Sequence, residues 1–453
     1  MKFDELRLIP PLLDAVHASG YETPTPIQSR VIPLVLKRKD VLACAQTGTG
    51  KTAAFALPIL QQLAGQVPQN RNMGGRNQPR KNQPRKIRSL VLAPTRELAQ
   101  QISDSFSTYG RNLGLKHTAV FGGVNKNPQS RTLRGGVDIL VATPGRLLDH
   151  MSEGTISLDS IEILVLDEAD RMLDMGFMPD IRRILKQIPK NRQTLFLSAT
   201  MPAPIRELAN EILSDPVAVE VARVSSPAES VEHLAYHVEK ASKRSLLSNL
   251  LTHIAYSRAL VFTRTKHGAD KVVRHLMHGK ISAAAIHGNK SQNARTRALD
   301  DFKSGKVGVL VATDIAARGL DVDGVSHVIN FDLTDEPETY IHRIGRTGRA
   351  GASGVAMSFI SSEEHDNLRG IQRLLGAKMQ LASDMPGYKA PTEPVVLQGE
   401  ERSGGGGKGK PRRSNAAPKQ APYFPKKKGT RRPPKPGRNR SGAKKRSVQT
   451  AAR

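Results

Sequence analysis

Five short apolar runs in the first half of the chain each end abruptly in polar or glycine residues. These runs are Asp40–Ala45, Ser89–Ala93, Val137–Ala142, Ile161–Leu166 and Thr194–Leu197. Short continuous runs of aliphatic residues are typical of strands buried on both faces, as in a parallel sheet. Since helical patterns separate the runs, the sequence predicts an α/β domain.

The helical patterns of this half cover Thr52–Leu63, Arg96–Thr108 and Ile205–Leu213. In parallel α/β sheets, ligands bind beyond the carboxyl ends of the strands. We therefore expect the polar motifs that follow the five runs to gather at one edge of one sheet.

The second half of the chain repeats this arrangement. Its apolar runs are Arg258–Phe262, Ile281–Ile286, Val307–Ala312, Val325–Asn330 and Gly354–Ile360. They predict a second parallel sheet, so the fold class is α/β with two tandem sheet domains.

Pro-rich, Gly-rich and strongly polar segments divide the chain. We expect a first domain over residues 1–213, a linker over 214–230 and a second domain over 231–381. Residues 65–88 are rich in Asn, Gln, Pro and Arg and predict a basic surface loop. Residues 382–453 have too few apolar side chains to offset the entropy of ordering, which predicts a disordered basic tail.

Charge is concentrated at the end of the chain. The 453 residues carry a net charge of +28, and residues 401–453 hold 18 Lys or Arg against one acid. This segment therefore carries +17 and the preceding residues +11. A polyanion is the expected partner, and nucleic acid is favoured because no apolar membrane-binding face accompanies the charge.

Composition excludes several other classes. No apolar stretch approaches the roughly 20 residues of a membrane span. The single cysteine, Cys44, excludes an internal disulfide framework and a cysteine-based zinc site. We expect a cytoplasmic protein, with Cys44 as a small core residue within its strand.

The segment AQTGTGKT (Ala45–Thr52) follows the first run and precedes a helical pattern. In such a loop, backbone amides cradle phosphates, Lys51 reaches the β- and γ-phosphates, and the Thr52 hydroxyl can ligate Mg²⁺. Ala45 stands where the general P-loop pattern has glycine. The alternative interpretation is a glycine turn with an incidental lysine.

Two adjacent carboxylates, Asp167 and Glu168, end another buried run. Beside a P-loop, Asp167 can hold Mg²⁺ while Glu168 polarises the attacking water. The alternative is a solvated helix N-terminus, where the helix dipole favours acids.

In the second half, IHRIGRTGR places Arg343, Arg346 and Arg349 at three-residue spacing. On one helix these side chains would share a face, which is ordinarily a solvated face. Opposite a bound triphosphate, the same arginines would stabilise charge on the transferring phosphoryl group.

Over about residues 1–375 the chain resembles a DEAD-box ATP-dependent RNA helicase of superfamily 2. The motifs that carry the resemblance are GYETPTPIQ (Gly20–Gln28) with Phe3 upstream, AQTGTGKT (Ala45–Thr52), PTRELA (Pro94–Ala99), Gly122–Gly123, TPGR (Thr143–Arg146), DEAD (Asp167–Asp170), SAT (Ser198–Thr200), VFTRT (Val261–Thr265), QNAR (Gln292–Arg295), ATDIAARGLD (Ala312–Asp321) and HRIGRTGR (His342–Arg349). The family's own P-loop begins with alanine, so Ala45 is no departure. The run DEADRMLDMGFMPDIRRIL and the basic tail are most similar to the bacterial RhlE-like branch.

The resemblance implies two RecA-like domains and a set of ATP-binding residues. The implied nucleotide contacts are Tyr21 stacking on adenine, Gln28 reading its edge, the loop residues Gln46, Thr47, Gly48, Thr49, Gly50, Lys51 and Thr52, and Asp321 on the ribose. The implied catalytic residues are Lys51, Asp167, Glu168, Arg346 and Arg349. Mg²⁺ would be held by Thr52 and Asp167, largely through water. Tyr21 could also be an ordinary packing residue.

The resemblance also implies RNA contacts and a coupling segment. Ser198 and Thr200 would couple hydrolysis to strand separation. The RNA sugar–phosphate backbone would be gripped by Pro94, Thr95, Arg96, Gly123, Thr143, Arg146, Arg264, Thr265 and Thr313. Gly122–Gly123 could instead be only a turn, and His287 is expected to be structural.

The motifs and the resemblance together imply an enzyme that couples RNA-stimulated ATP hydrolysis to local opening of short RNA duplexes or remodelling of RNA–protein complexes. Expected partners are ATP, Mg²⁺ and RNA read with little sequence specificity, with ribosomal precursors and RNA-decay proteins as candidates. The rival classes are a non-enzymatic RNA chaperone or clamp and a DNA helicase. The chaperone is disfavoured because Lys51, Glu168 and Arg346 are intact.

Overall fold

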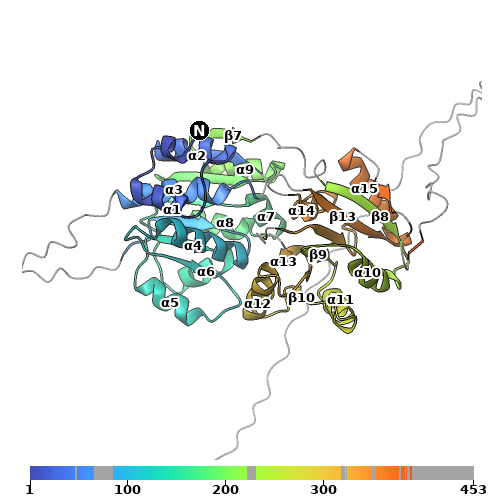
Figure 1. Ribbon diagram of the computed structural model, residues 1–453. Coiled ribbons are helices and arrows are strands. Elements are labelled where there is room, and N and C mark those ends of the chain that lie inside the picture. Colours follow the sequence, from blue (N-terminus) through green and yellow to red (C-terminus); the bar gives the residue numbers. More distant parts are fainter. Residues whose placement is uncertain are drawn as a thin grey trace, which may run out of the picture. The chain divides into compact units, whose positions relative to one another are not determined.

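The computed structural model describes residues 1–45, 48–65, 85–221, 231–317, 322, 324–348, 353–376, 379–382, 384 and 388–389. Within these residues the chain forms two parallel sheets of seven strands each (Figure 1). The predicted α/β class with two tandem sheets is therefore confirmed.

Ten of the fourteen strands in the described part of the chain coincide with the predicted apolar runs. In the first sheet they are β1 (Val41–Cys44), β2 (Ser89–Leu92), β3 (His117–Val120), β4 (Ile139–Ala142), β5 (Ile163–Leu166), β6 (Gln193–Ser198) and β7 (Val217–Glu220). In the second they are β8 (Val231–His237), β9 (Ala259–Phe262), β10 (Ala283–Ile286), β11 (Val309–Ala312), β12 (His327–Asn330), β13 (Gly354–Ile360) and β14 (Gln380–Leu381).

Helices connect the strands on both sides of each sheet. Those of the first half are α1 (Pro10–His17), α2 (Pro26–Leu36), α3 (Lys51–Ala64), α4 (Arg96–Gly110), α5 (Lys126–Arg134), α6 (Pro144–Ser152), α7 (Ala169–Asp174), α8 (Met178–Leu185) and α9 (Ala203–Ile212), preceded by the 3-10 helix η1 (Phe3–Leu6). Those of the second half are α10 (Lys243–His253), α11 (Lys266–His278), α12 (Gln292–Lys303), α13 (Asp314–Ala317), α14 (Pro337–Ile344), the 3-10 helix η3 (Ser362–Glu364) and α15 (His365–Leu375). None of these described helices combines the length and apolarity of a membrane span.

The two sheets share one topology. The strand order is β3-β4-β2-β5-β6-β1-β7 in the first and β10-β11-β9-β12-β13-β8-β14 in the second, so each strand of the second sheet occupies the place of the strand seven earlier. All pairings between named strands are parallel, for example Val41 opposite Leu195. The carboxyl ends of the strands therefore meet at one edge of each sheet, as the sequence predicts.

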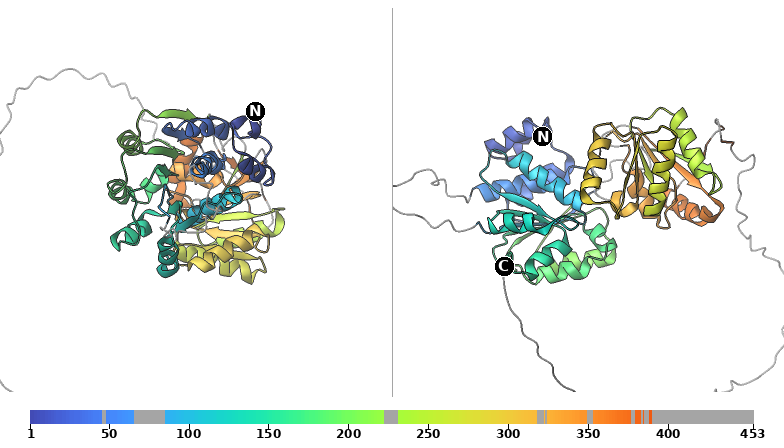
Figure 2. Two further views of the ribbon diagram at one scale, coloured as in Figure 1. Left: turned by 90° about the vertical axis from the view of Figure 1, so that its left-hand side faces the viewer. Right: turned by 90° about the horizontal axis from the view of Figure 1, so that it is seen from below.

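Alternate side chains of each strand enter different cores. In the first sheet, Val91 and Val165 pack with α1 to α4, whereas Leu90 and Leu164 pack with the helices of the other face. The second sheet has α10 and α11 on one face and α12 to α15 on the other. Figure 2 shows this covering of both faces, which explains why most of the strands are predominantly apolar rather than alternating.

Two predicted boundaries require correction. The expected linker over 214–230 contains β7, which pairs with β1 because Val217 and Val219 extend the apolar sheet edge; residues 222–230 lie outside the described part. The expected tail begins too early at 382. Ala382 and Tyr388 are buried in the second core, and the backbone N–H of His237 donates to the Tyr388 hydroxyl at 3.2 Å.

Candidate ATP and RNA site

The phosphate-binding candidate loop lies between β1 and α3. Gly48 and Gly50 have positive φ angles of 84° and 88°, which a side chain would strain, and α3 begins at Lys51. Lys51 is buried, and its Nζ donates to the Ala45 carbonyl at 2.6 Å. The Lys51 side chain thus folds back to Ala45, the first residue of the motif, and Thr52 lies in the first turn of the helix.

Gln28 contacts this loop from α2. Thr25 caps α2, and the Gln28 side chain closes a capping box by accepting from the Thr25 N–H at 2.9 Å. Gln28 Nε2 also donates to the Gly50 carbonyl at 3.2 Å. A Cβ on Gly50 would collide with Gln28 Nε2, so the proposed adenine-reading side chain and the glycine loop pack directly together.

Two buried carboxylates follow β5. Asp167 and Glu168 are 2% and 4% exposed. Burial raises the pKa of Asp167 to about 7, although the nearby Lys51 ammonium acts in the opposite direction. Glu168 adopts a left-handed backbone conformation with φ 53° and ψ 52°, which is costly for a residue with a side chain.

The acidic residues fit a Mg²⁺ site completed by solvent and phosphate. Asp167 Oδ1 is buried and has no hydrogen-bond partner within the described part of the chain. The same part contains no group of three His, Cys, Asp or Glu side chains able to hold a metal. Mg²⁺ commonly takes one or two carboxylates, several waters and substrate phosphates, so Asp167 with the Thr52 hydroxyl is a suitable donor set.

Asp170 joins the end of β5 to the end of β6. Its backbone N–H donates to Ser198 Oγ at 3.2 Å. Its Oδ2 accepts from the N–H groups of Ala199 and Thr200 at 3.1 and 2.8 Å and from the Thr200 hydroxyl at 2.9 Å. The DEAD and SAT segments are therefore one hydrogen-bonded unit two residues from Glu168.

The residues expected to grip RNA in the first sheet lie on the other half of its edge. Pro94, Thr95 and Arg96 follow β2, Gly123 follows β3, and Thr143 and Arg146 follow β4. Because β3, β4 and β2 are neighbours, these residues are segregated from those after β5, β6 and β1. The sheet edge is thus divided into a candidate RNA half and a candidate ATP half.

Local contacts explain the positions of four of these residues. Thr95 caps α4 by accepting from the Leu98 N–H at 3.2 Å. Gly123 has a φ of 77°, and a Cβ there would collide with the Arg96 guanidinium, so Arg96 lies against the glycine turn. Arg146 donates to the Val124 carbonyl at 3.4 Å, which brings it to the same turn.

The candidate RNA residues of the second sheet follow β9 and β11, the strands that correspond to β2 and β4 of the first sheet. Arg264 and Thr265 follow β9 and Thr313 follows β11, its immediate neighbour. Thr265 caps α11 by accepting from the Gly268 N–H, as Thr95 does for α4. Arg264 is about half exposed, and its Nη2 lies 3.2 Å from Asp335 Oδ1.

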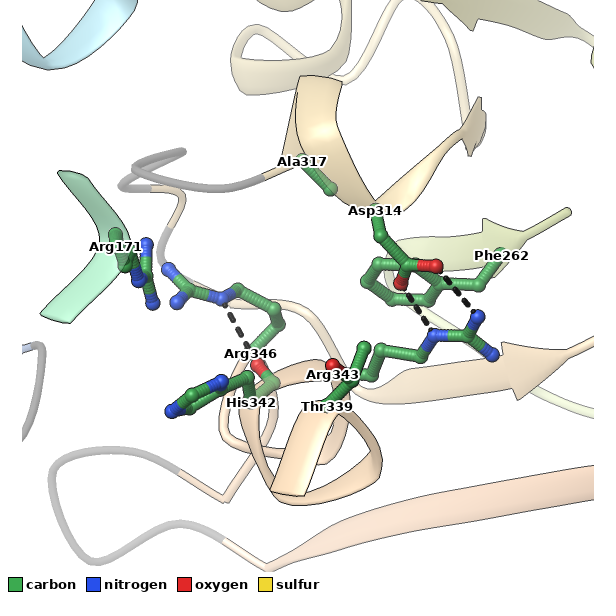
Figure 3. Close-up of a pocket in the computed structure, with 8 residues that line it drawn as sticks. All are labelled: Arg171, Phe262, Asp314, Ala317, Thr339, His342, Arg343 and Arg346. Atoms are coloured by element: carbon green, nitrogen blue, oxygen red, sulfur yellow. Dashed lines mark hydrogen bonds and ion pairs between the residues drawn. The ribbon is translucent and has the colours of Figure 1, made fainter. Parts of the chain in front are cut away.

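Arg343 and Arg346 do not lie on one helix, so the predicted shared helical face is wrong for this pair. α14 ends at Ile344 and Gly345 follows as its cap, so Arg346 lies beyond the helix, and Arg349 is outside the described residues. Arg343 forms a bidentate pair with Asp314 at 2.6 and 2.8 Å and is buried. Figure 3 shows Arg343 turned toward Asp314 while Arg346 points toward Arg171.

The structure also places four other residues that the sequence analysis named. Tyr21 is 49% exposed, and Phe3 is buried in the first core. His287 is buried with Nε2 at 3.1 Å from Asp270 Oδ1, in agreement with a structural role. Cys44 lies in β1 with intermediate burial and its Sγ donates to the Ala199 carbonyl. The expected site residues that lie outside the described part are Gln46, Thr47, Asp321 and Arg349.

Two residues of the QNAR motif that had no predicted role contact Glu97 of α4. Gln292 Nε2 donates to Glu97 Oε1 at 2.9 Å, and Arg295 lies 2.8 Å from Glu97 Oε2. These contacts join the start of α12 to the start of α4, beside Arg96. The presence of QNAR as a motif was the available signal, but no pattern in the sequence names Glu97 as its partner.

Comparisons with known proteins agree with this geometry. Residues 25–208 match the family model DEAD/DEAH box helicase, and residues 242–351 match the helicase conserved C-terminal domain. The chain is 41% identical over 88% of its length to the DEAD-box ATP-dependent RNA helicase CshA of Bacillus subtilis, covering 76% of that protein. Identity to CshA of Geobacillus kaustophilus is 42% over 88% of the chain and 81% of that relative.

Solved structures give the same result. The structure of Saccharomyces cerevisiae Dbp5 bound to RNA and ADP BeF3 matches with a TM-score of 0.71 and 31% identity, covering 84% of this chain and 95% of that one. A Dbp5 variant bound to Gle1 and IP6 matches with a TM-score of 0.66 and 32% identity, covering 85% and 96%. The predicted tandem RecA-like architecture is thereby confirmed. The chain belongs to the family of DEAD-box ATP-dependent RNA helicases.

Proposed function

We propose that this chain hydrolyses ATP at the β1, β5 and β6 half of its first sheet edge and grips RNA at the β2, β3 and β4 half. The strand order carries this proposal, because it separates the motifs that follow β1, β5 and β6 from those that follow β2, β3 and β4. The hydrogen bonds of Asp170 with Ser198, Ala199 and Thr200 connect the segment that contains Glu168 to the end of β6. This connection supports the proposed role of Ser198 and Thr200 in coupling hydrolysis to strand separation.

Individual roles follow from position and chemistry. Lys51 binds the β- and γ-phosphates, Asp167 and Thr52 hold Mg²⁺, and Glu168 accepts a proton from the attacking water. Mg²⁺, when bound, neutralises charge that develops on the phosphates. Arg346 supports the transferring phosphoryl group. Tyr21 and Gln28 contact the adenine.

The remaining nucleotide contacts belong to the same proposal. They are Gln46, Thr47, Gly48, Thr49 and Gly50 on the phosphates, Asp321 on the ribose and Arg349 beside Arg346. The first domain thus binds ATP, and the second supplies the arginines and the ribose contact. We propose that closure of the two domains assembles the complete site.

RNA is held through its sugar–phosphate backbone. The residues that contact it are Pro94, Thr95, Arg96, Gly123, Thr143 and Arg146 in the first domain and Arg264, Thr265 and Thr313 in the second. Backbone contacts position a strand without reading its bases, which gives little sequence specificity. Bending the gripped strand disfavours its duplex partner, so short duplexes open locally and ATP hydrolysis resets the enzyme.

Duplex opening is the direct test. A short RNA duplex with a single-stranded extension should separate when ATP is added and should stay paired with ADP, and a DNA duplex of the same sequence should be opened poorly. The Lys51→Ala variant should lose opening with either duplex. Equal opening with ATP and ADP would favour a passive RNA chaperone, and equal opening of DNA would contradict an RNA substrate.

Finer assignments rest on the sequence. The run Asp167–Leu185 and the basic tail support a placement of the chain in the bacterial RhlE-like branch of the family. The single cysteine and an RNA substrate support a cytoplasmic location. Ribosomal precursors and RNA-decay proteins are the proposed physiological partners, and pull-down of cellular RNA crosslinked to the chain would identify the substrate.

A further inference from the structure

Arg171 is a buried cation in the active-site turn that the roles above do not use. It lies on α7, its side chain is 2% exposed, and it is among the largest fully buried side chains. Burying a guanidinium costs several kcal/mol unless it is paired and hydrogen-bonded. The residues that pair with Arg171 should therefore indicate its role.

Its partner is Glu168. Arg171 Nη1 donates to Glu168 Oε2 at 3.0 Å, and the Glu168 side chain is only 5% exposed. The Arg171 backbone N–H also donates to the Glu168 carbonyl at 3.0 Å and to Asp170 Oδ1 at 3.1 Å. Backbone and side chain of Arg171 thus both hold the turn that presents Glu168.

The turn needs such support. Glu168 has a left-handed backbone with φ 53°, a conformation that persists where surrounding contacts fix it. A buried carboxylate on a strained backbone has several rotamers unless a partner selects one. Arg171 occupies Oε2, so Oε1 is the oxygen that remains to accept from water.

Arg171 also lies close to residues of the second domain. It lines a small pocket with His342 and Arg346, and Figure 3 shows its guanidinium near that of Arg346. The carboxylate in this pocket, Asp314, is held by Arg343. Arg171 pairs with Glu168 and lies beside Arg346, for which we propose contact with the phosphoryl group.

We propose that Arg171 is a positioning residue that fixes the Glu168 carboxylate for proton acceptance from the attacking water. This inference rests on the proposed role of Glu168. Because Arg171 acts through Glu168 and not on ATP, its loss should lower kcat while leaving the KM for ATP nearly unchanged.

The test is a double-mutant cycle in the full chain, read by RNA-stimulated ATP turnover. Since misplacing a catalytic group by about 1 Å can cost about 10²-fold, Arg171→Met should lower kcat about 10- to 100-fold, with KM changed less than about twofold. Arg171→Lys, which keeps a cation within reach of Glu168, should restore part of kcat. In a Glu168→Gln background, Arg171→Met should lower kcat by less than about twofold.

Arg182→Met is the matched control, because Arg182 on α8 also forms an ion pair, with Glu211 at 3.5 Å, but both side chains are about half exposed. Its kcat should be normal. If Arg171→Met does not fold, as judged by its unfolding midpoint, Arg171→Gln replaces it in the cycle. Normal kcat in the folded Met or Gln variant, or an equal loss in the Glu168→Gln background, would overturn the inference. Substantial turnover of Glu168→Gln itself would instead refute the role proposed for Glu168.

Discussion

Glu168 shows how much of the proposed chemistry depends on single backbone positions. It stands between buried β5 and the short helix α7 in a left-handed conformation, beside a carboxylate that burial makes harder to ionise. The sequence identifies the pair Asp167–Glu168 because two acids after a buried strand require a reason. It does not reveal the backbone angle or the bond to Arg171, since both depend on how α7 packs.

Replacing Glu168 by glutamine should remove the proton acceptor while keeping size and burial. Turnover of ATP should fall by on the order of 10²-fold or more, as for loss of a general base. ATP binding, measured with a fluorescent analogue, should be retained. Near-normal turnover would exclude Glu168 as the base.

Gln28 should determine selectivity for adenine. An amide side chain donates and accepts at once, which matches the exocyclic amine and ring nitrogen of adenine. Gln28→Ala should weaken ATP binding and narrow the preference for ATP over GTP. Nucleotide competition assays measure both effects.

The structure adds a necessary control for that experiment. Gln28 also closes the capping box of α2 and donates to Gly50, so its removal disturbs the helix as well as the base contact. Thr25→Ala removes the cap hydroxyl but keeps the amide, and it should retain selectivity for ATP. Equal use of ATP and GTP by the unaltered protein would exclude adenine reading.

At the scale of elements, prediction succeeded where strands are buried on both faces. β1, β2, β4, β5 and β6, together with β9, β11, β12 and β13 of the second sheet, lie in predominantly apolar runs, because helices cover both sides. β3 lies at the sheet edge with mostly half-buried residues, and β8 mixes polar with apolar residues, so neither forms such a run. The arginine spacing predicted a shared helical face, but α14 ends at Ile344, before Arg346. Spacing alone does not indicate where a helix ends.

A buried ion pair joins elements of the second domain. Lys243 Nζ at the start of α10 is 2.6 Å from Glu364 Oε2 and donates to the Phe331 carbonyl at 2.8 Å. Burial alone would raise the pKa of Glu364, but hydrogen bonds from Lys243 and Ser361 outweigh it and lower the pKa from 4.5. The stabilisation from Glu364 is therefore complete above pH 4.5 and is lost as pH falls through the lowered pKa.

Removing Lys243 should destabilise the second domain. Lys243→Met leaves Glu364 buried without its cation, and breaking a buried pair on one side costs about 3–5 kcal/mol. The urea midpoint of the full chain should fall. Adding Glu364→Gln, which removes the uncompensated charge, should recover part of the loss. An unchanged midpoint in the single variant would show that the pair is not structural.

At the scale of the whole molecule, two sheets of one topology carry complementary halves of the proposed site. The sequence predicted this because each polar motif follows an apolar run and parallel strands align their carboxyl ends. The contacts of Gln292 and Arg295 with Glu97 could not be predicted, since they join segments about two hundred residues apart.

The basic segment 401–453 should strengthen RNA binding without selecting sequence. A chain ending at Glu400 should keep its maximal ATPase rate but need more RNA to reach it. Roughly 6–10 phosphate contacts cost about 10³–10⁵ in affinity between 50 and 200 mM salt, so the shortened chain should show a shallower salt dependence. An unchanged RNA requirement and salt dependence would assign the segment no role in binding RNA.

ATP turnover by the full chain, with and without single-stranded RNA, tests the central claim most directly. Both halves lie at the carboxyl-end edge of one parallel sheet, and closure of the two domains on RNA is proposed to complete the ATP site. Occupation of the RNA half should therefore promote hydrolysis in the ATP half. The account predicts slow turnover without RNA, a large increase with RNA and a weaker response to DNA. Turnover that is absent with RNA, or that is the same with and without it, would contradict the account.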